Sequence, residues 1–263
     1  VVVSERRPVP LFQHVLVGRM LYELFAEMAP TAREMPGEGK TEVNPALIKI
    51  AREESRLVRD DARRPRGRSG RGRRTVSYGS GAYGGAAHRS RYGGAGRGPR
   101  SVHVPSRTEL VELLDEEALL PAIVFIFSRV GCDAAVRQLL ASRIRLTSRV
   151  EEQEIIAIIE RHVTGLSDGD LGALDYDRFA EALGMGVAAH HAGMLPTFKE
   201  CVEEAFVRGL IKVVFATETL ALGINMPARS VVLEKLVKFD GETHADVTPG
   251  EYTQLTGRAG RRG

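Results

Sequence analysis

Short apolar runs alternate with segments of helical periodicity through residues 108 to 263. The runs expected to be strands are 122–127, 186–189, 211–215 and 230–234. The segments expected to be helices are 108–118, 130–141, 149–162, 175–183 and 196–208. Strands separated by helices pair in parallel and are covered on both faces. We therefore predict an α/β fold with a mostly parallel sheet.

The chain before this region divides into three stretches. Residues 1–18 contain Pro8 and Pro10, favour an extended path and are predicted to be an interdomain linker. Residues 19–58 are predicted to be a helical segment that packs on the main domain, with helices from Arg19 to Met28 and from Pro45 to Val58. Residues 59–107 form an Arg/Gly-rich insert, and the main domain occupies residues 108–263.

The insert has a composition that cannot build a core. Residues 62–107 hold eleven glycines and twelve arginines but no Leu, Ile, Phe, Met or acidic residue, so we expect this segment to be disordered. The basic pI of about 9.0 comes from the insert, and the rest of the chain is net negative. Interleaved Arg, Tyr and Gly could hold a phosphate backbone and stack on unpaired bases. A solvated linker is the equally weighted alternative.

Two glycine-rich matches lack the context of a nucleotide site. Residues 37–41 end like a P-loop, but Glu34 stands where the first glycine is needed and no apolar strand leads in. Residues 79–84 fit GxGxxG without a strand before them or a helix after them, which leaves a dehydrogenase reading without support.

Four loops carry polar side chains and are expected at the carboxyl ends of the strands, where ligands bind in such sheets. They are Ser128–Arg129, His190–Gly193, Thr217–Thr219 and the closing stretch Gln254–Gly263. Hydroxyls, guanidinium groups and backbone N–H groups are the donors that phosphates accept. Strand alternation should turn one of the two histidines inward as a satisfied core residue, without indicating which. No Cys/His cluster predicts a metal site, and Cys132 and Cys201 are expected to be core thiols.

Together these loops resemble motifs IV, V and VI of the second RecA-like motor domain of superfamily two helicases. The resemblance is to the superkiller-type (Ski-like) DExH group, which includes bacterial HelY-like enzymes. Residues 254–263, QLTGRAGRRG, fit the QxxGRxGR pattern of motif VI in full. Residues 216–227, ATETLALGINMP, fit the motif V of that group, and HHAGMLP at 190–196 stands at the expected place before it.

The resemblance implies a three-layer RecA-like domain and a division of labour between the loops. Arg258 and Arg261 match the catalytic arginine fingers. The nucleotide side would comprise these two arginines with Gly223, Asn225, Gln254 and Gly257. The nucleic-acid side would comprise Ser128, Arg129, His190, His191, Gly193, Thr217, Glu218 and Thr219.

The same resemblance implies cofactors and partners. ATP with magnesium would be held mainly by a first RecA-like domain of the same full-length chain, because residues 1–263 contain neither a Walker A lysine nor a DExH carboxylate pair. The nucleic acid would be single-stranded, with RNA favoured over DNA. The expected activity is ATP-driven translocation and unwinding by the full enzyme. A non-catalytic nucleic-acid-binding protein that uses the insert is the alternative.

The ends of the chain and its apolar runs complete the expectations. Val1 is not an initiator methionine and Gly263 stops within motif VI, so we expect a fragment that is inactive by itself. The longest apolar run, 119–127, is too short to cross a bilayer and no apolar leader opens the chain, which favours a cytoplasmic protein without a membrane partner.

Deletion of residues 62–107 should weaken nucleic-acid binding and flatten its dependence on salt, because arginines that neutralise phosphates release counterions. Turnover of the full enzyme should change little. Binding titrations at several salt concentrations measure the slope, and an unchanged slope would reduce the insert to a spacer.

Overall fold

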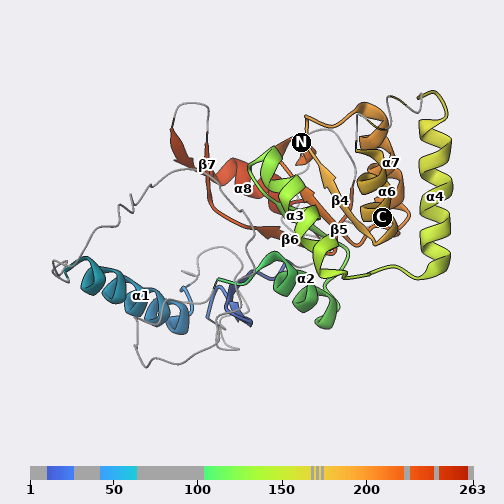
Figure 1. The fold of residues 1–263 in the computed structure, drawn as a ribbon. Coiled ribbons are helices and arrows are strands. Elements are labelled where there is room, and N and C mark those ends of the chain that lie inside the picture. Colours follow the sequence, from blue (N-terminus) through green and yellow to red (C-terminus); the bar gives the residue numbers. More distant parts are fainter. Residues whose placement is uncertain are drawn as a thin grey trace, which may run out of the picture. The chain divides into compact units, whose positions relative to one another are not determined.

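The computed structural model describes residues 11–26, 42–63, 104–166, 169, 172, 175–221, 226–239 and 243–259. The chain forms two compact units (Figure 1). Residues 12–105 make the N-terminal unit, and residues 1–11 with 106–263 make the α/β unit. Each unit is described by itself.

The α/β unit is built on a four-stranded parallel sheet in the order β4-β5-β3-β6. The strands are β3 (Ala122–Phe125), β4 (Val187–His190), β5 (Val213–Ala216) and β6 (Ser230–Leu233). β3 pairs with β5 on one side and with β6 on the other. β3 and β5 have no exposed residue, which explains why they are continuous apolar runs rather than alternating ones. The predicted α/β fold with a parallel sheet is confirmed.

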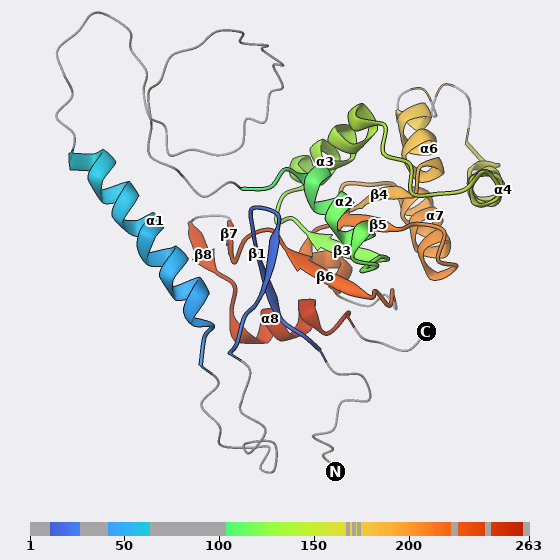
Figure 2. The ribbon, with the colours of Figure 1, turned by 90° about the horizontal axis from the view of Figure 1, so that it is seen from below.

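Helices cover both faces of this sheet (Figure 2). α2 (Arg107–Glu116) and α3 (Arg129–Ser142) pack on one face, and α4 (Arg149–Val163), α6 (Tyr176–Gly184) and α7 (Pro196–Val207) form the other layer. Alternate strand residues supply the two cores: Ile123 and Phe125 face the α4 and α7 layer, whereas Val124 faces α3. The capping box predicted at Ser148 and Glu151 opens α4.

The stretch after the sheet turns back onto the domain. β7 (Val237–Phe239) and β8 (His244–Asp246) form an antiparallel pair, and α8 (Pro249–Thr256) follows. Thr248 and Glu251 close a capping box at the start of α8. The hydrogen bond from Lys238 to Glu251, with those from Thr248, lowers the pKa of the Glu251 carboxyl to about 2. Lys238 therefore ties β7 to the helix that leads into motif VI.

The N-terminal unit corrects two sequence predictions. The described part of the helix predicted from Arg19 to Met28, residues 19–26, is not helical, because β1 (His14–Val17) and β2 (Met20–Glu23) pair as an antiparallel hairpin. Gly18 has a φ of 61°, which makes the two-residue turn possible. Apolar positions in so short a window fit a helix and a strand equally well. β1 also lies inside the predicted linker 1–18, whereas the helix predicted from Pro45 is confirmed as α1 (Pro45–Arg63).

The predicted insert 59–107 is too long at both ends. α1 continues to Arg63, and Arg107 is the first residue of α2, where Ser106 and Glu109 form a capping box. Residues 64–103 of the insert lie outside the described part of the chain. Among the described residues, no helix is long and apolar enough to cross a membrane.

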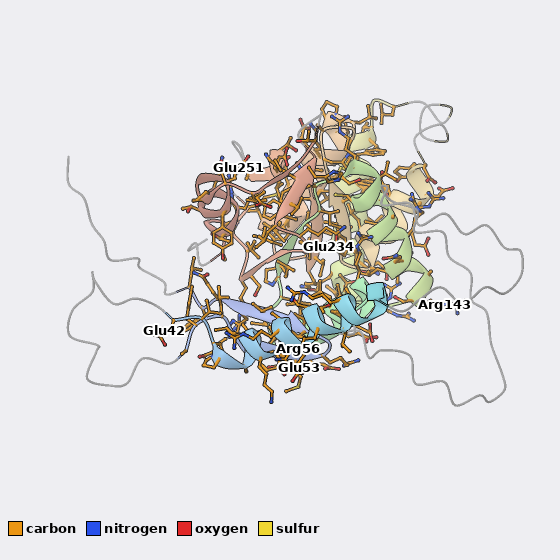
Figure 3. The ribbon with its side chains drawn as sticks, turned by 90° about the vertical axis from the view of Figure 1, so that its left-hand side faces the viewer. Glu42, Glu53, Arg56, Arg143, Glu234 and Glu251 are labelled. Atoms are coloured by element: carbon orange, nitrogen blue, oxygen red, sulfur yellow. The ribbon has the colours of Figure 1, made fainter. Side chains whose placement is uncertain are left out.

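Arg107 belongs to the core of the α/β unit. Its side chain is 9% exposed and pairs with both carboxylate oxygens of Glu234, Nε to Oε1 at 3.2 Å and Nη2 to Oε2 at 3.0 Å. Glu234, labelled in Figure 3, directly follows β6. This bidentate pair fixes the start of α2 to the end of an edge strand.

Arg107→Ala should lower the free energy of unfolding by about 2 kcal/mol, because it removes a buried side chain and its bidentate hydrogen bonds to the partly exposed Glu234 carboxylate. Arg145→Ala is the matched control. It removes an ion pair to Glu152 that is 46% and 32% exposed, and should cost less than about 1 kcal/mol. Urea unfolding of the variants measures both effects. An equal loss in the two variants would contradict the structural role of Arg107.

Candidate functional site

Three of the four loops come together at the carboxyl edge of the sheet. Because β4, β5 and β3 are neighbours and parallel, the residues that follow them lie side by side. The Thr217 N–H donates to the His190 carbonyl at 3.2 Å, which joins the loops after β5 and β4. A Cβ on Gly193 would lie 3.4 Å from Arg129 Cδ, so the loops after β4 and β3 are also in contact.

The loop after β3 presents an exposed cation at the start of a helix. The Ser128 hydroxyl caps α3 by accepting the Gly131 N–H at 3.1 Å, and Arg129 is the first helical residue. Both side chains are exposed. The unpaired N–H groups in the first turn of a helix favour a bound anion, and the Arg129 guanidinium adds a positive charge at the same place.

His191 is held in one tautomer by two partners. Its Nδ1 accepts the Gly193 N–H at 3.2 Å, so Nδ1 carries no proton. Its Nε2 therefore carries the proton and donates to Asp133 Oδ1 of α3 at 3.0 Å. The ring is 6% exposed, and it fixes the loop 191–193 to the helix that begins with Arg129.

His190 points to the opposite helix layer. Its Nε2 lies 2.8 Å from Glu203 Oε1 of α7, and the ring is 3% exposed. Nδ1 is buried and has no hydrogen-bond partner among the described residues. Burial lowers the pKa of His190, and the hydrogen bond to Glu203 opposes that shift only in part.

Strand alternation predicted one inward histidine, and the structure buries both. His190 faces α7 and His191 faces α3, as strand alternation requires. Both are buried because helices cover both faces of this sheet. Any contact from this loop to a ligand must therefore come from its exposed residues Ala192 and Gly193.

The loop after β5 begins with a buried threonine. Thr217 is 8% exposed, and its hydroxyl lies 2.9 Å from that of Thr219, which is exposed. The Thr217 carbonyl accepts the Leu220 N–H at 3.1 Å and opens the 3₁₀ helix η2 (Glu218–Ala221). The Glu218 side chain is exposed.

The described part of the fourth loop, residues 254–259, reaches the other end of the sheet as well. Ala259 bridges in parallel to Ala228, and the Arg258 carbonyl accepts the Ala228 N–H at 3.2 Å. Ala228 precedes β6, so this part of motif VI lies near the amino-terminal end of that strand rather than at the carboxyl edge. A Cβ on Gly257 would lie 2.8 Å from the Thr253 carbonyl oxygen, so the turn requires glycine.

Arg258 is buried in this turn. The side chain is 6% exposed, and Nη2 donates to the carbonyl of Ala221 at the end of η2. Arg258 thus connects motif VI to motif V. Gln254 is exposed on α8, whereas Gly223, Asn225 and Arg261 lie outside the described residues.

The described part of the chain has neither a candidate metal site nor an ionised thiol. No group of three His, Cys, Asp or Glu side chains there could hold a metal ion. Cys132 and Cys201 are buried, and burial raises the pKa of each thiol to about 12. Neither thiol is ionised at neutral pH.

The sequence did not identify two carboxylates that position the site. Asp133 lies 58 residues before His191, and Glu203 lies 13 residues after His190. Each is one of several charged residues on an amphipathic helix, and only the packing of that helix selects it. A histidine pair at the end of a doubly covered strand was the available signal, since a buried imidazole needs a partner.

Comparisons with known proteins agree with this geometry. Residues 136–263 match the helicase conserved C-terminal domain. The whole chain is 52% identical to "Probable helicase HelY" of Mycobacterium leprae over 266 residues, and covers 26% of that protein. It is 46% identical over 154 residues, 59% of the chain, to "Superkiller complex protein 2" of Homo sapiens, covering 12% of that protein. It is 45% identical over 154 residues, again 59% of the chain, to "DExH-box ATP-dependent RNA helicase DExH11" of Arabidopsis thaliana, covering 11% of that protein.

The α/β unit is therefore a RecA-like helicase C-terminal domain. The chain belongs to the superkiller-type DExH helicases and is HelY-like along its whole length. It spans about a quarter of the length of the HelY proteins it matches.

The stability of the chain should fall as the pH drops below about 6.5, in part through His190. The folded pKa of His190 lies below its ordinary value of 6.5, so its contribution is present above pH 6.5 and is lost as the pH falls through the folded value. Protonation would place a charge on the buried Nδ1.

His190→Gln should reduce the loss of thermal stability between pH 7 and pH 5, because glutamine does not titrate there. His14→Gln, at an exposed position of β1, is the control and should leave the loss unchanged. Melting temperatures across this pH range measure it. An equal loss in the wild type and the His190 variant would contradict the assignment.

Proposed function

We propose that this chain supplies the second motor domain of an ATP-dependent nucleic-acid helicase. The observation that carries the proposal is the meeting of the loops after β3, β4 and β5 at one sheet edge, with motif VI joined to motif V through Arg258 and Ala221. One face of the domain would grip nucleic acid and another would meet ATP. The link between them is a single turn, η2.

The nucleic-acid grip would use the exposed donors at the carboxyl edge. Arg129, Ser128 and Thr219 are exposed there, and the Gly193 backbone lies against the Arg129 side chain. Guanidinium and hydroxyl donors suit phosphate oxygens and read no sequence, as a translocating motor requires. Glu218 carries the wrong charge for a phosphate, and we assign it to a sugar hydroxyl or base edge.

His190, His191 and Thr217 would act as positioning residues in this grip. All three are buried, and each bonds to a neighbouring loop or helix rather than facing solvent. The Asp133–His191–Gly193 chain holds the Gly193 loop beside Arg129, so that both could contact the same strand.

The nucleotide side would be completed by another domain. ATP with magnesium would be held mainly by a first RecA-like domain, and the chemistry it supplies is phosphoryl transfer with charge developing on the γ-phosphoryl group. Arg261 follows the turn that Gly257 permits, and we assign it as the arginine finger. Gln254 is exposed on α8 beside this turn and would face the nucleotide. Gly223 and Asn225 would continue this side between η2 and Met226.

Arg258 has a different proposed task from Arg261. Its guanidinium is buried and holds the Ala221 carbonyl, so it would reach a nucleotide only by leaving that contact. We assign it as the positioning residue that couples motif VI to η2, and through η2 to Thr217. ATP-dependent movement of motif VI would then move the nucleic-acid grip.

Single-stranded RNA is the proposed substrate in preference to DNA, since one relative carries "RNA helicase" in its name. We further propose that residues 1–263 alone do not hydrolyse ATP. Insertion of this chain behind a first motor domain should restore nucleic-acid-stimulated hydrolysis. A non-catalytic binder would show no hydrolysis in either form.

Two substitutions in the full-length helicase separate the two arginines. Arg261→Ala should reduce nucleic-acid-stimulated ATP turnover by roughly a thousandfold with little change in melting temperature, as loss of an arginine finger does. Arg258→Ala should reduce turnover and also lower the melting temperature, because the buried link to Ala221 is lost. ATPase rates and thermal melts measure both. Undiminished turnover in Arg261→Ala would refute the finger assignment.

A further inference from the structure

Helix α1 of the N-terminal unit carries a regular row of cations that the proposed helicase site does not use. We define the α1 basic stripe as Lys49, Arg52, Arg56 and Arg59. Steps of three, four and three residues place the four side chains on one face of a helix. All four are exposed, and Figure 3 labels Arg56 among them.

The other side of α1 has a different character. Leu47, Ile50 and Leu57 are half-buried and lie across the helix from the stripe. The helix is therefore amphipathic, with its partly covered apolar side set apart from its cationic side. The two described acidic side chains, Glu53 and Glu54, lie at the flank of the stripe and on the far side.

The cations of the α1 basic stripe lack ion-pair partners among the described carboxylates. Among the side chains that the structure describes, no carboxylate forms an ion pair with these four cations. Other surface arginines do find partners: Arg161 pairs with Glu204, and Arg178 pairs with Asp175. With respect to the described carboxylates, the four charges of the stripe are available to an anionic ligand.

The spacing of the charges matches a polyanion. At 1.5 Å per residue, four cations over this stretch lie roughly 5 Å apart along the axis, a separation of the same order as successive phosphates of a strand. A small anion would need a convergent site, but this row is linear. The chain also continues from α1 into the arginine-rich residues 63–74, which extend the basic character in sequence.

We infer that the α1 basic stripe binds the phosphate backbone of single-stranded nucleic acid, as a grip separate from the sheet-edge loops. This inference rests on the proposed helicase function. The stripe would add sequence-independent affinity without contributing to the chemistry. It would also explain why the four cations stand on a regular helix.

The test is a triple variant of the chain, Arg52→Gln, Arg56→Gln and Arg59→Gln, which keeps helix propensity because arginine and glutamine are similar helix formers. The control is Arg137→Gln, Arg143→Gln and Arg149→Gln, which removes the same charge from exposed positions of the α/β unit. Fluorescence anisotropy with a 20-nucleotide oligouridine at several salt concentrations gives the affinity and its salt slope.

The stripe variant should bind about ten- to a hundredfold more weakly at 0.1 M salt, with a salt slope smaller by about 2, because each single-strand phosphate contact contributes about 0.7. The control variant should bind as the wild type does. Circular dichroism should show unchanged helix content in both.

Other outcomes are distinguishable. If the stripe variant binds oligouridine as tightly as the wild type does, the inference fails and the proposed function stands. The stripe would then be assigned to an acidic protein partner. An equal loss in the stripe and control variants also overturns the inference, because net charge alone then sets affinity. If the wild type does not bind oligouridine at all, the inference and the proposed nucleic-acid grip fail together.

Discussion

The parallel pairing of β3 with β5, and of β5 with β4, is the constraint on which the rest of the domain depends. It is made of fully buried backbone whose N–H and C=O groups must be paired, so the register of the strands is fixed. Because all three strands end at the same edge, loops separated by up to ninety residues of sequence meet there. The contact between Gly193 and Arg129 is a direct result.

The buried imidazoles of His190 and His191 hold the loop after β4 in place at this edge of the sheet. One carboxylate from each helix layer hydrogen-bonds a histidine at the end of β4: Glu203 of α7 bonds His190, and Asp133 of α3 bonds His191. A hydrogen bond to each of these carboxylates holds the buried imidazole in place and orients the loop. The Nδ1 of His191 accepts a hydrogen bond from the Gly193 N–H, so the same ring positions both the strand end and the loop after it.

Arg258 links motif VI to motif V within the described part of the domain. The sequence motif places it beside Arg261, and the structure shows that the Arg258 side chain is buried. A guanidinium held by a backbone carbonyl at the end of η2 connects motif VI to the turn that starts at Thr217. Under the proposed function, a shift of α8 and its following turn would move η2 and Thr217 through these contacts, with no need for a long-range pathway.

The sequence by itself determined the α/β class, most helix and strand positions, and the identity of the motif residues, because buried parallel strands are continuous apolar runs and caps have local signatures. It could not decide the hairpin at 14–23, where a short apolar window fits two periods. Nor could it include Arg107 in the core, because its partner Glu234 is 127 residues away. Tertiary structure alone decided that both histidines are buried, that Asp133 and Glu203 hold them, and that Arg258 of motif VI is buried against Ala221 and Ala228. These features depend on which helix packs on which face, and that is settled by the whole core rather than by any local pattern.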